Sequence, residues 1–364
     1  MGREGLVQRD TEVQSRVRVA AVTAAEPGQK RPTRRRNAIL GALSHANDSL
    51  HPLLPTNPTF AGHQTFAFRS SWLKKGIDAL ATPGFDARDV FGTDEALAIL
   101  GVGKNMVGSI RHWLTATRMA EDASDRGDRR LTPTALGSAV FGSIRGKRSG
   151  WDPFLEDLAT LWLIHWQLVS YGSLVFTWAW TFNYFREYEF SRDSLADSLL
   201  RAAAGRAPRV PSRATVLRDA DCLLRTYVRG DDGSDSEETF DCPLAELQLI
   251  RPAFHGHFAF TIGPKLDLPM AVFCYAMISY WAARHWESAA LSIHELAYGE
   301  GSPGFGFKLD IETVSSYLDQ IEEATDGALV FTDSSQGQQV SRSGKAELPD
   351  PMGFLKRYYE ENHS

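Results

Sequence analysis

The sequence predicts a mainly α-helical protein with small β wings, in which helix-turn-helix or winged-helix units surround a helical middle region. Three observations support this fold class. Apolar residues recur at helical spacing in most segments, glycine turns and capping residues separate short helices, and short extended runs flank turn sequences. The chain has 364 residues, of which 43% are hydrophobic, and this is enough for two or three domains with cores of their own.

A glycine-rich stretch, LGVGKNMVGSIRHWL from Leu100 to Leu114, raises the question of nucleotide binding. Its Gly-Lys step resembles the end of a P-loop. However, Ala98 stands where the earlier glycine belongs, and Asn105 stands where a hydroxyl should follow the lysine. The dinucleotide-binding pattern fails as well, because Met106 occupies the position of its third glycine. We therefore expect no nucleotide cofactor.

The same stretch fits a helix-turn-helix better. A short helix over residues 94–100 precedes a turn at Gly101–Gly103, and Asn105 is a good N-cap for a second helix whose apolar residues share one face. Turn-like residues 125–128 then precede a wing strand that begins near residue 129. We predict DNA contacts on the polar face, with a packed helical hairpin as the alternative. The predicted contacts are Lys104, Asn105, Arg111, His112, Arg129 and Arg130.

Residues 1–58 are predicted to form a disordered basic tail, because they are rich in Arg, Gln, Thr, Pro and Ala and nearly lack aromatic residues. This tail holds nine Lys and Arg against five Asp and Glu, so the rest of a chain with net charge −6 is acidic. Any nucleic-acid site must therefore be local. The tract KRPTRRR, Lys30 to Arg36, could hold DNA phosphates. A solvated tail or an over-extended start is the alternative.

Order is predicted to begin at FAGHQTFAFRSSWLKKGIDAL, Phe60 to Leu80. Gly62 and His63 form a turn in this interpretation, and Ser70 or Ser71 caps the helix that follows. Polar side chains at this density among aromatic residues suggest a site. The alternative is that His63 and Arg69 only hold the turn by hydrogen bonds. The candidate catalytic residues are His63, Arg69, Lys74 and Lys75.

The middle region, residues 151–204, is predicted to consist of long helices. Its uncharged run from Leu158 to Phe182 has the length of a membrane span, but five tryptophans lie between Trp151 and Trp180, where a span would carry leucine and valine. We therefore expect a buried pair of helices and no membrane partner. Glu156 and Asp157, with His165, are possible metal ligands. A helix N-terminus that favours negative charge is the preferred explanation of the acidic pair.

A second candidate recognition helix follows Ser212, which can cap it. Arg213 and Arg218 lie off its apolar face and are predicted DNA contacts. The loop GDDGSDSEET, residues 230–239, is acidic and would repel DNA. His255 and His257 flank a glycine and could chelate a metal, but no third ligand is near, so a hairpin tip is preferred.

The C-terminal part repeats the helix, helix and wing pattern. One helix is predicted over 291–299, Asp310 caps a second, Gly327 ends it, and ALVFTD pairs with QQVSR across SSQG. The second helix is acidic and is expected to pack against protein. The predicted divisions of the chain are the tail 1–58, an N-terminal helix-turn-helix or winged-helix module 59–150, the helical middle 151–229, an acidic loop, hairpin and buried helix 230–290, and a C-terminal winged-helix module 291–364.

Only three cysteines occur, Cys222, Cys242 and Cys274, and none lies in a C-x-x-C pair. This excludes a cysteine-based zinc site of the usual spacing and suggests a reducing cytoplasm. The N-terminus opens with charged residues and has no apolar segment of a secretory signal. We therefore expect a cytoplasmic protein.

Several blocks, taken in order, carry a resemblance to a known family. They are GHQTFAFRSSWLKKG, LGVGKNMVGSIRHW, DPFLEDLATLWLIHWQL, CPLAELQLIRP, FTIGPKLDLP and SPGFGFKLD. They resemble the signature blocks of a family long described as a domain of unknown function, which includes the SspB proteins of bacterial DNA phosphorothioation systems. The resemblance spans about residues 60–345.

This resemblance implies a DNA-nicking endonuclease that acts in single-strand DNA phosphorothioate modification and phage defence. It also implies double-stranded DNA as substrate. The partners would be a cysteine desulfurase, an ATP-pyrophosphatase and an ATPase, and a homodimer is possible. A nuclease of this kind would be expected to use Mg²⁺ or Mn²⁺, although its metal ligands are unknown. No PD-(D/E)xK, HNH or GIY-YIG pattern is present. A non-catalytic DNA-binding adaptor and a protein-binding scaffold are therefore the alternatives.

Overall fold

The structure is a computed structural model in which residues 53–55, 57–81, 90–92, 95–122, 131–142, 150–204, 206, 209–229, 242–335, 337–344 and 347–362 are described. The basic tract at 30–36, the predicted contacts Arg129 and Arg130, and the acidic loop at 230–239 lie outside these residues. The described chain is mainly helical, and its three small sheets are antiparallel. This confirms the predicted class of mainly α structure with small β elements.

The N-terminal part consists of helices and one short hairpin. Helices α2, α3 and α4 contact one another, and the hairpin packs on α2 and α4 before a closing helix. The second strand and the closing helix lie within residues 131–142. The elements are α2 (Ser70–Ala81), α3 (Glu95–Leu100), α4 (Lys104–Ala116), β1 (Ala120–Asp122), β2 (Leu131–Pro133) and α5 (Ala135–Phe141).

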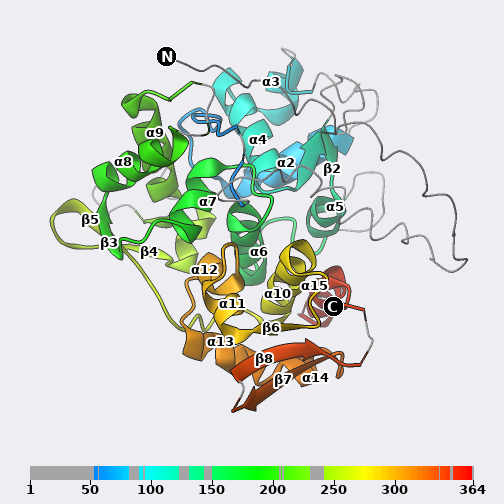
Figure 1. Ribbon diagram of the computed structural model, residues 1–364. Helices are drawn as coiled ribbons and strands as arrows, with labels where there is room; N and C mark the ends of the chain where they lie inside the picture. The colour runs from blue at the N-terminus through cyan, green and yellow to red at the C-terminus, as the bar shows by residue number, and fades with distance from the viewer. Residues whose placement is uncertain are drawn as a thin grey trace, which may run out of the picture. The chain divides into compact units, whose positions relative to one another are not determined.

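Two helices fill the predicted buried middle, α6 (Leu158–Val169) and α7 (Phe176–Asn183). They lie near the centre of the view in Figure 1, and nearly all their residues are buried. No helix among the described residues is long and apolar enough to cross a membrane. Asp157 is the N-cap of α6 and accepts a hydrogen bond from the Ala159 amide, as the preferred explanation of the acidic pair requires.

Two further sheets share one connectivity. In each, a strand leads into helices, a two-stranded hairpin follows, and the first strand pairs with the last, giving the orders β3-β5-β4 and β6-β8-β7. The first set comprises β3 (Glu189–Ser191), α8 (Arg192–Ala203), α9 (Arg213–Tyr227), β4 (Ile250–Pro252) and β5 (His257–Phe260). The second comprises β6 (Ala290–Ser292), α11 (Ile293–Tyr298), α13 (Ile311–Leu318), β7 (Leu329–Ser334) and β8 (Gly337–Arg342).

Further short and long helices connect and cover these sets. Helix α10 packs on α6 and on α15, the last helix described. In Figure 1 the β6–β8 sheet lies at the bottom of the view and the β3–β5 sheet at the left. These remaining elements are η1 (Pro243–Leu247), η2 (Phe254–Gly256), α10 (Met270–Arg284), α12 (Pro303–Phe307), α14 (Ile321–Ala324) and α15 (Pro351–Asn362).

Local signals in the sequence find most element ends. Ser212 caps α9 and Asp310 caps α13, both through their side chains, and β7 and β8 pair as predicted. Three details differ. The N-cap of α4 is Gly103, without a side-chain bond, so Asn105 lies inside the helix. The helix predicted from residue 291 is preceded by strand β6, and the predicted acidic helix divides into α13 and α14.

The end of the predicted tail packs against the folded chain. Leu53 and Leu54 are both buried, and Leu53 lies so close to Gly301 that a Cβ there would meet its Cδ1 at 2.9 Å. These two leucines lie in an otherwise polar and proline-rich stretch, so only a tertiary contact distinguishes them from the rest of the tail. The boundary near residue 58 remains a prediction.

A buried lysine joins the middle helices to the C-terminal set. The Lys308 ammonium donates to the carbonyl of Phe182 at 2.6 Å and lies over the rings of Phe182 and Phe260. Lys265 is buried next to it and donates to the carbonyl oxygens of Thr261 and Gly263. Burial, with repulsion from Arg186 and Lys265, lowers the pKa of Lys308 to about 7.

The pKa of Lys308 predicts a specific dependence of stability on pH. Because the folded pKa of about 7 lies below the ordinary 10.5, the unfolded chain binds more protons between these values, and the free energy of unfolding rises with pH in that window. We expect Lys308→Met to remove this rise. The wild-type slope should exceed that of the variant by up to about 1.4 kcal/mol per pH unit.

Urea denaturation at several pH values between 7 and 10.5 measures this slope. Lys356→Met is the matched control, because Lys356 is exposed on α15 and pairs with Glu360 at 3.7 Å, a surface contact of little energetic weight. Its slope should match that of the wild type. Equal slopes for the wild type and Lys308→Met would contradict a lowered pKa of Lys308.

Candidate nucleic-acid interface

The loop between Phe60 and Phe66 has an unusual backbone. Ala61, Gln64 and Thr65 adopt positive φ angles of 61°, 50° and 69°. This left-handed region is uncommon for residues other than glycine and persists only where surrounding contacts fix it. Gln64 and Thr65 are nevertheless exposed. The loop is therefore held from beneath and presents its strained side to solvent.

A buried carboxylate, Asp219 on α9, holds this loop. Its Oδ1 accepts the Ala61 amide at 2.6 Å and His63 Nε2 at 3.1 Å, and its Oδ2 accepts the Thr177 hydroxyl of α7 at 3.1 Å. His63 Nδ1 accepts the Thr65 amide at 3.1 Å, which places the ring proton on Nε2. The carboxylate therefore has three donors drawn from the loop and a neighbouring helix.

This arrangement bears on the predicted catalytic role of His63. The residue is only 1% exposed, and both ring nitrogens have partners in the protein. A general base needs a nitrogen within reach of the proton that it removes. In this geometry His63 orients the loop, and its catalytic role stays a prediction. Its ties to Asp219 and Thr65 correspond to the alternative in which the histidine holds the turn.

Helices α4 and α9 hold the other atoms of the loop. Ser109 donates to the His63 carbonyl at 3.0 Å, and both Trp113 Nε1 and the Cys222 thiol donate to the Phe66 carbonyl. The Arg225 guanidinium donates to the Thr65 carbonyl. The loop is therefore fixed between the helix for which the sequence predicts DNA contacts and the second candidate recognition helix.

His112 lies under the loop and does not project outward. A Cβ on Gly62 would meet His112 Nδ1 at 2.6 Å, so glycine is required for this close approach. Burial, with a contribution from His63, lowers the pKa of His112 to about 3. The ring is therefore neutral at physiological pH. Charge attraction between His112 and a phosphate is thus absent, although its predicted DNA contact remains untested.

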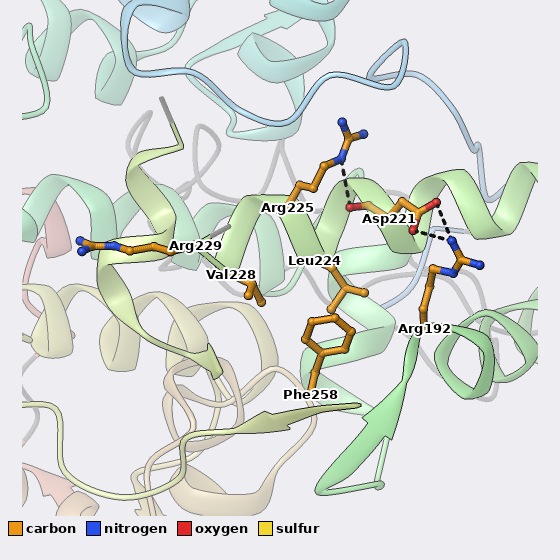
Figure 2. Close-up of a pocket in the computed structure, with 7 residues that line it drawn as sticks. All are labelled: Arg192, Asp221, Leu224, Arg225, Val228, Arg229 and Phe258. Carbon is orange, nitrogen blue, oxygen red and sulfur yellow. Dashed lines mark hydrogen bonds and ion pairs between the residues drawn. The ribbon is translucent and has the colours of Figure 1, made fainter. Parts of the chain in front are cut away.

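An open groove lies along the exposed side of α9, and its volume is about 370 Å³. We call it the arginine groove. Figure 2 shows arginine side chains at its rim, with Leu224 and Phe258 directed toward each other beneath them. Cations over an apolar floor suit a polyanion that also carries flat apolar groups. The lining residues are Arg192, Asp221, Leu224, Arg225, Val228, Arg229 and Phe258.

Asp221 holds two of the arginines at the rim of the groove. Asp221 accepts Arg192 Nη1 at 3.2 Å, and its carbonyl accepts Arg225 Nε at 3.4 Å. Three arginines against one aspartate leave the groove lining with a net positive charge. Arg218 is exposed two turns before Arg225 on the same face of α9. An extended anion is therefore better matched to this surface than a single small one.

The loop lies next to α4. Gly108 approaches Gln64, since a Cβ there would lie 3.5 Å from its Cγ. Lys104 and Asn105 are exposed at the start of the same helix, where the first amide groups and the helix dipole favour an anion. We call the arginine groove, the exposed loop residues and the beginning of α4 the strip, because Arg225 bonds the loop and Gly108 of α4 approaches it.

The remaining predicted site residues are spread around this strip. Arg69 stacks on Phe66 and Trp72, whereas Lys74 pairs with Asp78 within α2. Lys75 donates to the Leu100 carbonyl at 3.4 Å, beside the turn before α4. Two predicted DNA contacts already have acidic partners: Arg111 pairs with Asp122, and Arg213 pairs with Asp193 and Asp197.

The predicted metal ligands do not assemble. Asp157 caps α6, whereas His165 lies in the core and bonds Tyr227 and the Gly306 carbonyl. His255 and His257 lie at the end of the β4–β5 hairpin, as expected for a tip. Within the described ranges, no group of three or more His, Cys, Asp or Glu could hold a metal ion. The described donors therefore do not fit a metal held by three protein ligands.

Comparisons with known proteins agree with this fold. Residues 60–359 match the family described as "Protein of unknown function (DUF4007)". A magnesium ion-bound SspB crystal structure is similar, with a TM-score of 0.69 and 25% identity over 84% of this chain and 94% of that chain. A second SspB crystal structure has a TM-score of 0.68 at 25% identity, covering 84% and 95%. No curated protein matches the chain in sequence.

The Asp219 contacts predict a strong effect of a small change. Asp219→Asn keeps the shape but replaces one accepting oxygen by an NH₂ group that faces other donors. We expect the free energy of unfolding to fall by about 3 kcal/mol. Urea denaturation measures this loss, and hydrogen exchange at Gln64 and Thr65 should accelerate more than exchange in α15.

Asp193→Asn provides the matched control. Asp193 is an exposed partner of Arg213, and such surface ion pairs contribute little to stability. A loss in Asp219→Asn no larger than in this control, with unchanged exchange in the loop, would show that the carboxylate does not hold the strained backbone.

Proposed function

Because the chain belongs to the DUF4007 family and shares its fold with SspB, we propose that it is a DNA-nicking endonuclease acting in single-strand DNA phosphorothioate modification and phage defence. The observation that carries this proposal is the arginine groove, an open cationic surface on a fold otherwise rich in acidic side chains. The partners would be double-stranded DNA and the cysteine desulfurase, ATP-pyrophosphatase and ATPase of the modification system. The protein would act in the cytoplasm.

In this proposal duplex DNA lies along the strip from the arginine groove to α4. Arg225 and Arg229 bind phosphates at the groove, and Lys104 and Asn105 bind them at the beginning of α4. Contacts of this kind position a duplex without reading its sequence. The shared connectivity of the β3–β5 and β6–β8 sets supports their assignment as winged-helix modules, with α9 in the position of a recognition helix.

For the chemical step, we propose that the block from His63 to Lys75 forms the site. Its arginine and lysines would stabilise the negative charge that develops on the phosphate, and His63 would act as a positioning residue for the loop. The magnesium in the similar SspB structure is in keeping with metal-dependent hydrolysis. Since the described donors do not fit three protein ligands, this proposal assigns no residue of the chain as a metal ligand.

A non-catalytic adaptor that presents DNA to the sulfur-transfer partners is the second candidate function. Two observations favour it. The ring nitrogens of His63 are both occupied, and the described residues contain no group of metal ligands. An adaptor would need only the arginine groove and a surface for its partners. A homodimer remains compatible with either function.

Conversion of supercoiled plasmid to open circles tests the nickase. We expect the wild type with Mg²⁺ or Mn²⁺ to nick, and EDTA to abolish nicking. Arg69→Ala should reduce the rate about 100-fold, the usual cost of removing one group that stabilises developing charge. His63→Ala should also reduce it, with a matching loss of stability. DNA binding without nicking by the wild type would favour the adaptor.

Salt dependence of DNA affinity tests the groove itself. Each lost phosphate contact lowers the slope of log affinity against log salt by about 0.9. We expect Arg218→Ala with Arg229→Ala to lower it by about 1.8. Arg357→Ala, which removes an exposed arginine of α15 paired with Asp326, is the control and should leave the slope unchanged. Equal slopes in all three proteins would place the DNA elsewhere.

A further inference from the structure

The β4–β5 hairpin ends in an exposed aromatic side chain. Phe254 is 86% exposed, and it begins the short turn η2 at the hairpin tip. His255 and Gly256 follow with φ angles of 58° and 73°, and the Ala253 amide donates to the His257 carbonyl at 2.8 Å. The tip is therefore closed by its own backbone and holds Phe254 outward.

The same hairpin forms part of the arginine groove. Phe258 of β5 lines the groove floor and lies four residues beyond Phe254. At the rise of a strand this is at most about 13 Å, which is comparable with the width of a DNA groove. Strand β4 also contacts α9, so the hairpin and the arginine-bearing helix belong to one packed unit.

The charge around the aromatic tip indicates which partner would cover it. Residues 250–260, IRPAFHGHFAF, contain no acidic side chain. Arg251 and His255 are exposed on either side of Phe254, and His257 is half-buried. Arg192 and Arg225 line the groove at the base of the hairpin. An exposed apolar ring on a hairpin without acidic side chains, beside a groove lined by arginines, is complementary to a duplex, which has phosphates outside and stacked bases within.

We infer that the β4–β5 hairpin is a wedge, and that Phe254 inserts between stacked base pairs of duplex DNA whose backbone lies in the arginine groove. Apolar side chains inserted in this way partly unstack a base step and kink the duplex. The inference rests on the proposed function as far as DNA binding is concerned, but it does not need the nicking activity. Its consequence is a local opening of the duplex beside the groove.

Permanganate reactivity of thymines tests the wedge on a duplex of mixed sequence. A duplex of several hundred base pairs is incubated with the full chain in EDTA. The chelator prevents metal-dependent cutting, which would itself create free strand ends. Binding of the same duplex is followed by fluorescence anisotropy. We expect the wild type to raise thymine reactivity severalfold, and Phe254→Ala to lose this increase while retaining most of its affinity.

Two matched variants complete the test. Phe254→Trp keeps a large ring and should retain the increase. Leu266→Ala removes another fully exposed apolar side chain, outside the hairpin, and should behave as the wild type. Binding without any increase in the wild type, or an undiminished increase in Phe254→Ala, would overturn the wedge and leave the proposed DNA binding intact. Failure of the wild type to bind duplex at all would overturn both.

Discussion

A single buried carboxylate organises the surface on which the proposed function depends. Asp219 lies inside the fold, where an unsatisfied charge is costly, and the loop amide of Ala61, the His63 ring and the Thr177 hydroxyl satisfy it. These contacts join α9, α7 and the strained loop into one unit. Because Arg225 on the same helix bonds the loop at Thr65, the edge of the arginine groove is set by the same arrangement.

The buried and the exposed ionisable groups of this protein have different roles. The half-buried His112 and the buried His165 are held neutral, as their pKa values of about 3 indicate. The ammonium of Lys308 is surrounded by a carbonyl oxygen and aromatic rings. By contrast, Arg218 and Arg225 of α9 are exposed at the surface. The internal groups therefore maintain shape, while the proposed binding relies on exposed guanidinium groups.

The two sets of strand, helices and hairpin show how one arrangement can carry different surfaces. On α9 the exposed side chains include Arg218 and Arg225, which suit a polyanion. The corresponding α13 is followed by Glu322 and Glu323 in the first turn of α14, which would repel DNA and suit a protein partner. The same backbone connectivity can thus serve different partners through the charge of the exposed helical face.

Local signals in the sequence determined much of the helical framework. Ser212 and Asp310 are caps because a hydroxyl or carboxylate reaches amides only three residues ahead, and the β7–β8 hairpin follows from adjacent strands. Only the tertiary structure decided the site. Asp219 is a carboxylate buried beside the apolar face of its helix, but its partner His63 is 156 residues away. Such contacts depend on how distant elements pack, and no short-range pattern encodes that packing.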